Sequence, residues 1–172
     1  MKRRIVMILL IFFGFILQST LLKQIAIANI SPNLLLILTV SFGLMRGKKE
    51  GMFTGFLCGF LSDLMYGDIL GFQALLYLTA GYLCGFCYRI FYDDDIKMPV
   101  VLIAGSDLAY GILMYAFQFL LRGRISFPYY LGRIIIPEVL YTMILTILIY
   151  RLLLRLNRLL EKGERRSVDS FV

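Results

Sequence analysis

Uncharged, mostly apolar runs alternate with short polar connectors along the chain, and they predict six helices. These helices cover approximately residues 5–22, 32–45, 51–66, 72–88, 99–121 and 133–154. A hydrocarbon layer about 30 Å thick needs roughly 20 apolar residues per helix, so runs of this kind are typical of membrane spans. The pattern predicts an all-α integral membrane protein in which residues 1–154 form one polytopic domain.

The first run follows the basic residues 2–4, as the apolar part of a signal peptide does. Its outer end, Gln18 to Lys23, contains no small-x-small cleavage site, so we expect a retained first helix. The Gln18 amide could hydrogen-bond to neighbouring helices. Pro32 suits the first turn of the second helix, which is short for a full span.

Polar connectors separate the later runs and follow the last one. Arg46 to Glu50 predicts a basic turn, and Gly67 to Gly71 predicts a tight turn because it holds two glycines and Asp68. Residues 93–95 are three aspartates in the most polar loop. Residues 155–172 are basic and amphipathic at first and polar afterwards, which predicts a cytoplasmic tail lying on the membrane.

Basic residues favour the cytoplasmic side of a membrane protein. If six spans start from the inside, the outside receives only four of the 18 lysines and arginines, namely Lys23, Arg122, Arg124 and Arg133. This asymmetry predicts that both termini lie in the cytoplasm of a multi-pass plasma-membrane protein.

Composition agrees with a bilayer as solvent, since 60% of residues are hydrophobic, 17% are charged and the mean hydropathy is +0.82. We attribute the net charge of +7 to topology and expect no nucleic-acid partner. Histidine is absent, which removes the commonest general base and transition-metal ligand. We therefore expect no metal and no cofactor, and we interpret Cys84 and Cys87 as small core residues rather than a redox motif.

The third run carries a ladder at spacing four: Gly51, Gly55, Gly59, Asp63 and Gly67. Small residues at this spacing let another helix approach closely, which drives helix association in lipid. The ladder predicts a seam, either within the chain or with a partner, and we favour packing within the chain.

Three acidic residues fall inside predicted spans: Asp63, Asp107 and Glu138. An acid at mid-membrane costs about 2.5 to 3.5 kcal/mol on insertion scales, so each needs a partner or a function. For Asp63 we favour a structural pair with an outer arginine over a proton relay or a ligand site. The three acids permit a proton pathway, although their spacing does not require one.

The arrangement of motifs resembles the MreD family of the bacterial rod-shape machinery. The resemblance covers nearly the whole chain and is most specific between Pro32 and Gly85. It rests on a first helix ending in Gln18-Ser19, on Pro32-Asn33-Leu34-Leu35-Leu36, on Arg46-Gly47, on Gly55 to Asp63, and on Gly67, Leu70-Gly71 and Leu75-Leu76-Tyr77.

The resemblance implies a non-catalytic scaffold for cell elongation and lateral peptidoglycan synthesis. Its implied partners are an MreC-like bitopic membrane protein, MreB, and RodA with its class B penicillin-binding protein. It also implies a fold similar to the S subunits of energy-coupling-factor vitamin transporters. That likeness defines the alternative function, a vitamin-binding subunit; an enzyme ranks third because the acids have no recognisable catalytic companion.

Overall fold

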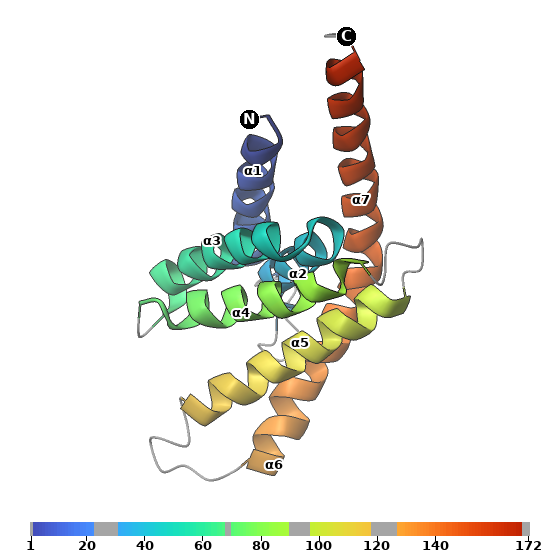
Figure 1. The fold of residues 1–172 in the computed structure, drawn as a ribbon. Coiled ribbons are helices and arrows are strands. Elements are labelled where there is room, and N and C mark those ends of the chain that lie inside the picture. Colours follow the sequence, from blue (N-terminus) through green and yellow to red (C-terminus); the bar gives the residue numbers. More distant parts are fainter. Residues whose placement is uncertain (1, 23–30, 68–69, 90–96, 118–126, 170–172) are drawn as a thin grey trace.

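The fold is built from helical rods, as a computed structural model shows (Figure 1). The structure describes residues 2–22, 31–67, 70–89, 97–117 and 127–169, and all secondary structure in these ranges is helical. The α-helices are α1 (Lys2–Leu17), α2 (Leu34–Arg46), α3 (Lys48–Tyr66), α4 (Phe72–Phe86), α5 (Lys97–Tyr115), α6 (Phe127–Tyr130) and α7 (Ile136–Asp169). Short π or 3-10 segments continue α1 (Gln18–Leu22) and α4 (Cys87–Arg89) and join α6 to α7 (Leu131–Ile135).

Each of the six predicted ranges contains a helix, but the last rod is longer than predicted. It starts at Phe127, and α7 continues to Asp169 without the break expected at residue 155. Residues 155–169 contain no proline and only one glycine, and their leucines, arginines, lysine and glutamates are good helix formers. The predicted tail is therefore the end of α7.

Two helical stretches in the described residues are long and apolar enough to cross a membrane, Lys97–Tyr115 and Leu131–Asn157. Apolar stretches in α1, α2 and α4 are shorter, at 10–17 residues. Helix α3 has 19 residues, but it begins with three charged residues and contains Asp63. Among the described residues, fewer helices qualify as spans by length and composition than the six that the sequence predicted.

Helix α2 lies at the centre of the molecule. Every residue from Leu34 to Met45 is buried, and α2 contacts α1, α3, α4, α5 and α7. A helix that is apolar on all sides needs apolar surroundings on all sides. Here the neighbouring helices supply them.

Helices α3 and α4 lie side by side in front of α2 (Figure 1), and glycines bring their backbones into contact. A Cβ atom added at Gly51 would lie 2.5 Å from the carbonyl oxygen of Gly81. Added Cβ atoms at Gly55 and Gly59 would meet the backbones of Tyr77 and Ala74. The glycine ladder therefore packs within the chain, against α4.

The outer faces of the rods carry many large apolar side chains. On α1, exposed residues include Ile5, Leu9, Phe12 and Phe13, and on α7 they include Leu140, Ile144, Leu148 and Leu152. Water-soluble monomers rarely expose contiguous apolar surface of this extent. These faces suit contact with lipid or with other membrane helices.

The start of α1 and the end of α7 lie on the same side of the molecule (Figure 1). On α7, the Asn157 side-chain oxygen accepts a hydrogen bond from Arg46 Nε at the end of α2, with a length of 2.8 Å. The Arg46 guanidinium also lies 5.1 Å from the centre of the Phe42 ring. These contacts join α7 to the central helix.

The seam predicts that even one methyl group at Gly59 destabilises the fold. In Gly59→Ala the new Cβ meets the α4 backbone, and such overpacking costs about 1 to 3 kcal/mol, which lowers the unfolding midpoint by roughly 3 to 10 °C. The measurement is thermal unfolding in detergent with a thiol-reactive dye, which reports exposure of the buried thiols of Cys58 and Cys84.

Gly105→Ala on α5 is the matched control. A Cβ at Gly105 has nothing within 4 Å, so the variant should unfold at the wild-type midpoint or slightly above it. Equal midpoints for the two variants would contradict the close contact at Gly59.

Candidate functional site

The N-terminus of α2 is the meeting point of polar side chains from several helices. Asn33 caps α2, since its side-chain oxygen accepts the N–H of Leu36 at 3.2 Å. The same oxygen accepts the hydroxyl of Tyr77 from α4 at 2.7 Å. The backbone N–H of Asn33 donates to the hydroxyl of Thr142 from α7 at 3.3 Å. Asn33 thus fastens the start of α2 to α4 and α7.

Gln18 completes the same helix end from the α1 side. Its side-chain oxygen accepts the backbone N–H of Leu35 at 3.0 Å. The first N–H groups of a helix have no partner within the helix, so a side chain from another element can satisfy them. The hydrogen bond that the sequence predicted between Gln18 and a neighbouring helix is confirmed.

Asp63 performs a similar task for α4. Its two carboxylate oxygens accept the backbone N–H groups of Gly71, Gln73 and Ala74 at 3.0, 3.1 and 2.9 Å. Asp63 is 2% exposed, and it places a negative charge at the positive N-terminal end of α4. The carboxylate is therefore a helix cap supplied by a neighbouring helix.

Among the described residues, backbone amides are the partners that the structure shows for Asp63. Arg133 lies over the ring of Tyr129, with 5.7 Å between the guanidinium carbon and the ring centre. Lys23, Arg122 and Arg124 fall outside the described residues. The first turn of α4 lies directly beside Asp63, and a pair of Asp63 with Arg122 or Arg124 stays a prediction.

A second polar group links α3, α4 and α5. The Ser62 hydroxyl donates to the side-chain oxygen of Gln73 at 2.5 Å, and the Tyr110 hydroxyl donates to the same oxygen at 3.4 Å. The Tyr110 ring meets the Tyr77 ring edge to face, with 5.3 Å between ring centres. The two tyrosines join this group to the Asn33 cap.

Asp107 and Glu138 lie beside this cluster. The Asp107 side chain on α5 is 2% exposed and close to Asn33 and Thr142. Neither of its carboxylate oxygens has a hydrogen-bond partner among the described residues. Glu138 at the start of α7 is near enough to Asp107 to interact with it electrostatically.

The structure thus places the predicted site residues in four regions. Gln18, Asp107 and Glu138 surround the start of α2, whereas Asp63 caps α4. Gly51, Gly55 and Gly59 lie in the α3–α4 seam, and Gly67 ends α3, where its N–H donates to the Asp63 carbonyl at 3.0 Å.

The sequence patterns did not mark Asn33, Gln73, Tyr77, Tyr110 and Thr142 as site residues, although these interactions need them. Asn33 carried a usable signal, because asparagine is a preferred N-cap and follows a proline at the predicted helix start. The other four are single polar residues in apolar helices, and helix rotation decides whether such residues meet.

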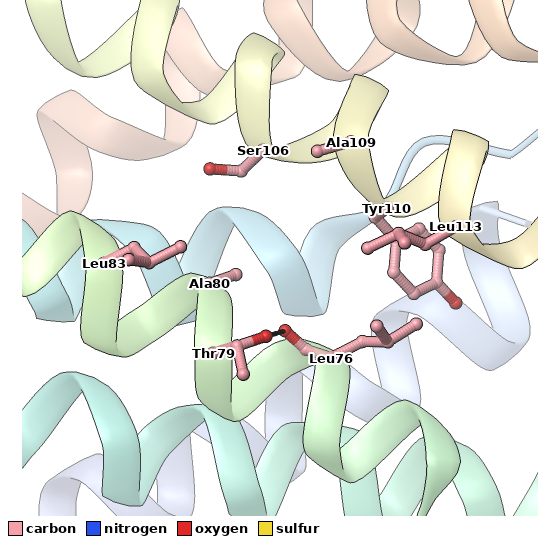
Figure 2. A pocket seen from close by; sticks show the side chains of 8 residues that line it. All are labelled: Leu76, Thr79, Ala80, Leu83, Ser106, Ala109, Tyr110 and Leu113. Carbon is pink, nitrogen blue, oxygen red and sulfur yellow. Dashed lines mark hydrogen bonds between the residues drawn. The ribbon is translucent and has the colours of Figure 1, made fainter.

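A groove of about 120 Å³ lies between α4 and α5 (Figure 2). It is lined by Leu76, Thr79, Ala80, Leu83, Ser106, Ala109, Tyr110 and Leu113. Its hydroxyl groups are used within the protein: Thr79 donates to the Leu76 carbonyl and Ser106 to the Leu102 carbonyl, both at 2.8 Å. The groove therefore presents a mainly apolar surface with small residues at its base.

Within the described residues, no three His, Cys, Asp or Glu side chains gather where they could hold a metal ion. Most of the buried polar groups described above bind helix ends or one another. Chemically, the arrangement can satisfy backbone groups away from water and can position helices.

Comparison with known proteins gives one family. The family model described as rod shape-determining protein MreD matches residues 1–160. No curated protein and no solved structure gives a significant match.

The capping role of Asp63 predicts a graded loss of stability. Asp63→Ala removes all three acceptor contacts and should lower the free energy of unfolding by about 1 to 3 kcal/mol. Asp63→Asn keeps one acceptor oxygen and should lose less. Thermal unfolding of both purified variants measures the order. If Asp63 instead took part in a proton relay or bound a ligand, the two variants should unfold at the same midpoint and should both lose function.

Proposed function

The chain belongs to the MreD family of rod shape-determining proteins, and we propose that it acts as a non-catalytic membrane scaffold in cell elongation. Its proposed partners are an MreC-like bitopic membrane protein and, with it, MreB, RodA and a class B penicillin-binding protein. In this role it supports lateral peptidoglycan synthesis by holding these proteins together in the plane of the cell membrane. The family match over residues 1–160 is the observation that carries the proposal.

The use of polar side chains supports a scaffold. Gln18, Asn33 and Asp63 are committed to helix ends, so they are not free to act on a substrate. An enzyme needs positioned groups that remain free to react. Rigid, satisfied helix ends suit a protein that holds others in place.

We place the partner contact at the α4–α5 groove rather than at the glycine ladder, since α4 already covers the ladder. Ala80 and Ala109 line the groove, and Gly105 is exposed on α5, with open space where a Cβ would be. Gly105 and Ala109 form a small-xxx-small pair, which allows close approach of a second membrane helix. A single apolar helix of a bitopic partner fits such a surface.

The proposed topology places both termini in the cytoplasm. The shared side of the α1 start and the α7 end supports it, as does the distribution of basic residues. Six helical rods also support a likeness to vitamin-transporter S subunits. The groove is smaller than the 300 to 1,000 Å³ of typical small-molecule pockets, which favours a helix-docking surface over a vitamin site there.

Gentle purification from the native host tests the scaffold role. Mass spectrometry of co-purifying proteins should find an MreC-like protein and wall synthases, and analysis of small molecules should find no stoichiometric vitamin. Recovery of an ATPase pair with a bound vitamin would replace the scaffold by a transporter subunit.

Filling the groove should weaken binding of the partner without lowering the stability of the fold. Ala109→Phe fills the groove and should lower recovery of the MreC-like partner at least about tenfold, the equivalent of about 1.4 kcal/mol, with little change in the unfolding midpoint. Quantitative co-purification and thermal unfolding measure the two effects.

Ile144→Phe is the control, because Ile144 is 70% exposed on α7, outside the groove. It should leave recovery unchanged. Normal partner recovery with Ala109→Phe would exclude the groove as the contact surface.

A further inference from the structure

Asp107 is a buried carboxyl group that the proposed scaffold role does not use. It is 2% exposed in the middle of α5, one of the two stretches able to cross a membrane. Both carboxylate oxygens lack hydrogen-bond partners among the described residues. A bare carboxylate in such surroundings is very unfavourable unless a proton or a cation neutralises it.

The groups facing Asp107 come from every helix packed around it. They are Asn33 at the start of α2, Tyr77 on α4, Tyr110 on α5 itself, and Glu138 and Thr142 on α7. From α3, Asp63 reaches only Tyr110 electrostatically. In the part of the chain that the structure describes, neither Asp107 nor Glu138 is paired with a lysine or arginine.

Among the described residues, these surroundings supply oxygen atoms and the Asn33 amide group but no positive charge. Carboxylate, amide and hydroxyl oxygens bind hard cations or share a proton. Thr142 and Asn33 already hold the start of α2, so a ligand at Asp107 would touch the junction of α2, α5 and α7.

We propose that Asp107 and Glu138 form a binding site for one small monovalent cation, either a proton or a sodium ion, at this junction. An organic cation is too large for a carboxyl group buried to this extent. A divalent metal ion is disfavoured because no group of three suitable side chains occurs in the described ranges. Occupancy of the site stabilises the packing of α5 on α2 and α7.

The proposed site contains Asp107 and Glu138 but not Asp63. Three backbone N–H groups satisfy its carboxylate, so it needs no cation. Asp107 has the same burial without backbone N–H donors among the described residues, and the side chains that lie close to it include those of Asn33 and Thr142. The site is also independent of the scaffold role, because cation binding can be measured on the purified protein without any partner.

Thermal unfolding of the full chain in detergent tests the site. Midpoints are recorded from about pH 6 to about pH 9 and over a range of sodium concentrations, with N-methylglucamine holding the ionic strength constant. Wild type, Asp107→Asn and Glu138→Gln are compared. Glu50→Gln, which changes a carboxyl group in the first turn of α3, is the control and should behave as wild type.

If the ligand is sodium, added sodium should raise the wild-type midpoint by roughly 3 to 8 °C at fixed pH, and Asp107→Asn should not respond. If the ligand is a proton, the wild-type midpoint should fall by a similar amount as pH rises, at every sodium concentration. Asp107→Asn should then be less dependent on pH and more stable than wild type at high pH.

Equal responses of wild type and Asp107→Asn to both pH and sodium would overturn the site. If Asp107→Asn does not fold, the decision rests on Glu138→Gln and on wild type. A wild-type response that Glu138→Gln reduces supports the site, and a wild type indifferent to both cations overturns it.

Discussion

In apolar surroundings the first N–H groups of a helix have no water to bind, and each one left unsatisfied costs several kcal/mol. Much of this fold follows from that constraint. Helix α2 starts inside the molecule, where the side chains of Asn33 and Gln18 accept hydrogen bonds from N–H groups of its first turn. The Thr142 hydroxyl accepts the N–H of Asn33. Helix α4 starts beside α3, where Asp63 receives three of its N–H groups. Each of these hydrogen bonds also fixes one helix against another. The same side chains therefore satisfy backbone N–H groups and position the helices.

Close backbone contact between α3 and α4 makes the Asp63 cap possible. Glycines at 51, 55 and 59 let α4 approach until its backbone touches α3, and this approach places the first turn of α4 within reach of the carboxylate. The same three-helix contact includes Gly43 of α2, whose added Cβ would lie 2.9 Å from the Gly81 carbonyl. Van der Waals contact and hydrogen bonding therefore reinforce one another along this seam, which is how helices associate where burial from water contributes little.

The apolar runs were sufficient to locate the six helical rods, because hydropathy and turn residues mark most of their ends. They also identified the glycine ladder and the bond made by Gln18. The sequence patterns failed where the structure depends on which faces of two helices meet. Rotation of α4 and α5 brings Tyr77 and Tyr110 together beneath Asn33, and no sequence spacing encodes that rotation. The backbone partners of Asp63 were missed for a related reason. A charged side chain suggests a partner of opposite charge, and a sequence does not show which backbone amides will lie beside it. The extra length of α7 was missed because the polar residues after 154 were interpreted as a separate tail lying on the membrane, although they favour a continuing helix.

That extra length has a mechanical consequence. At about 1.5 Å per residue, the 34 residues of α7 form a rod of about 51 Å, against a hydrocarbon layer of about 30 Å. Roughly 20 Å of the rod therefore extends beyond such a layer as a lever arm. The bond between Asn157 and Arg46 ties the rod to the enclosed helix α2 part of the way along. A sideways force near Asp169 would turn α7 about this tie, and the opposite end of the rod would carry the movement to Thr142 and Asn33.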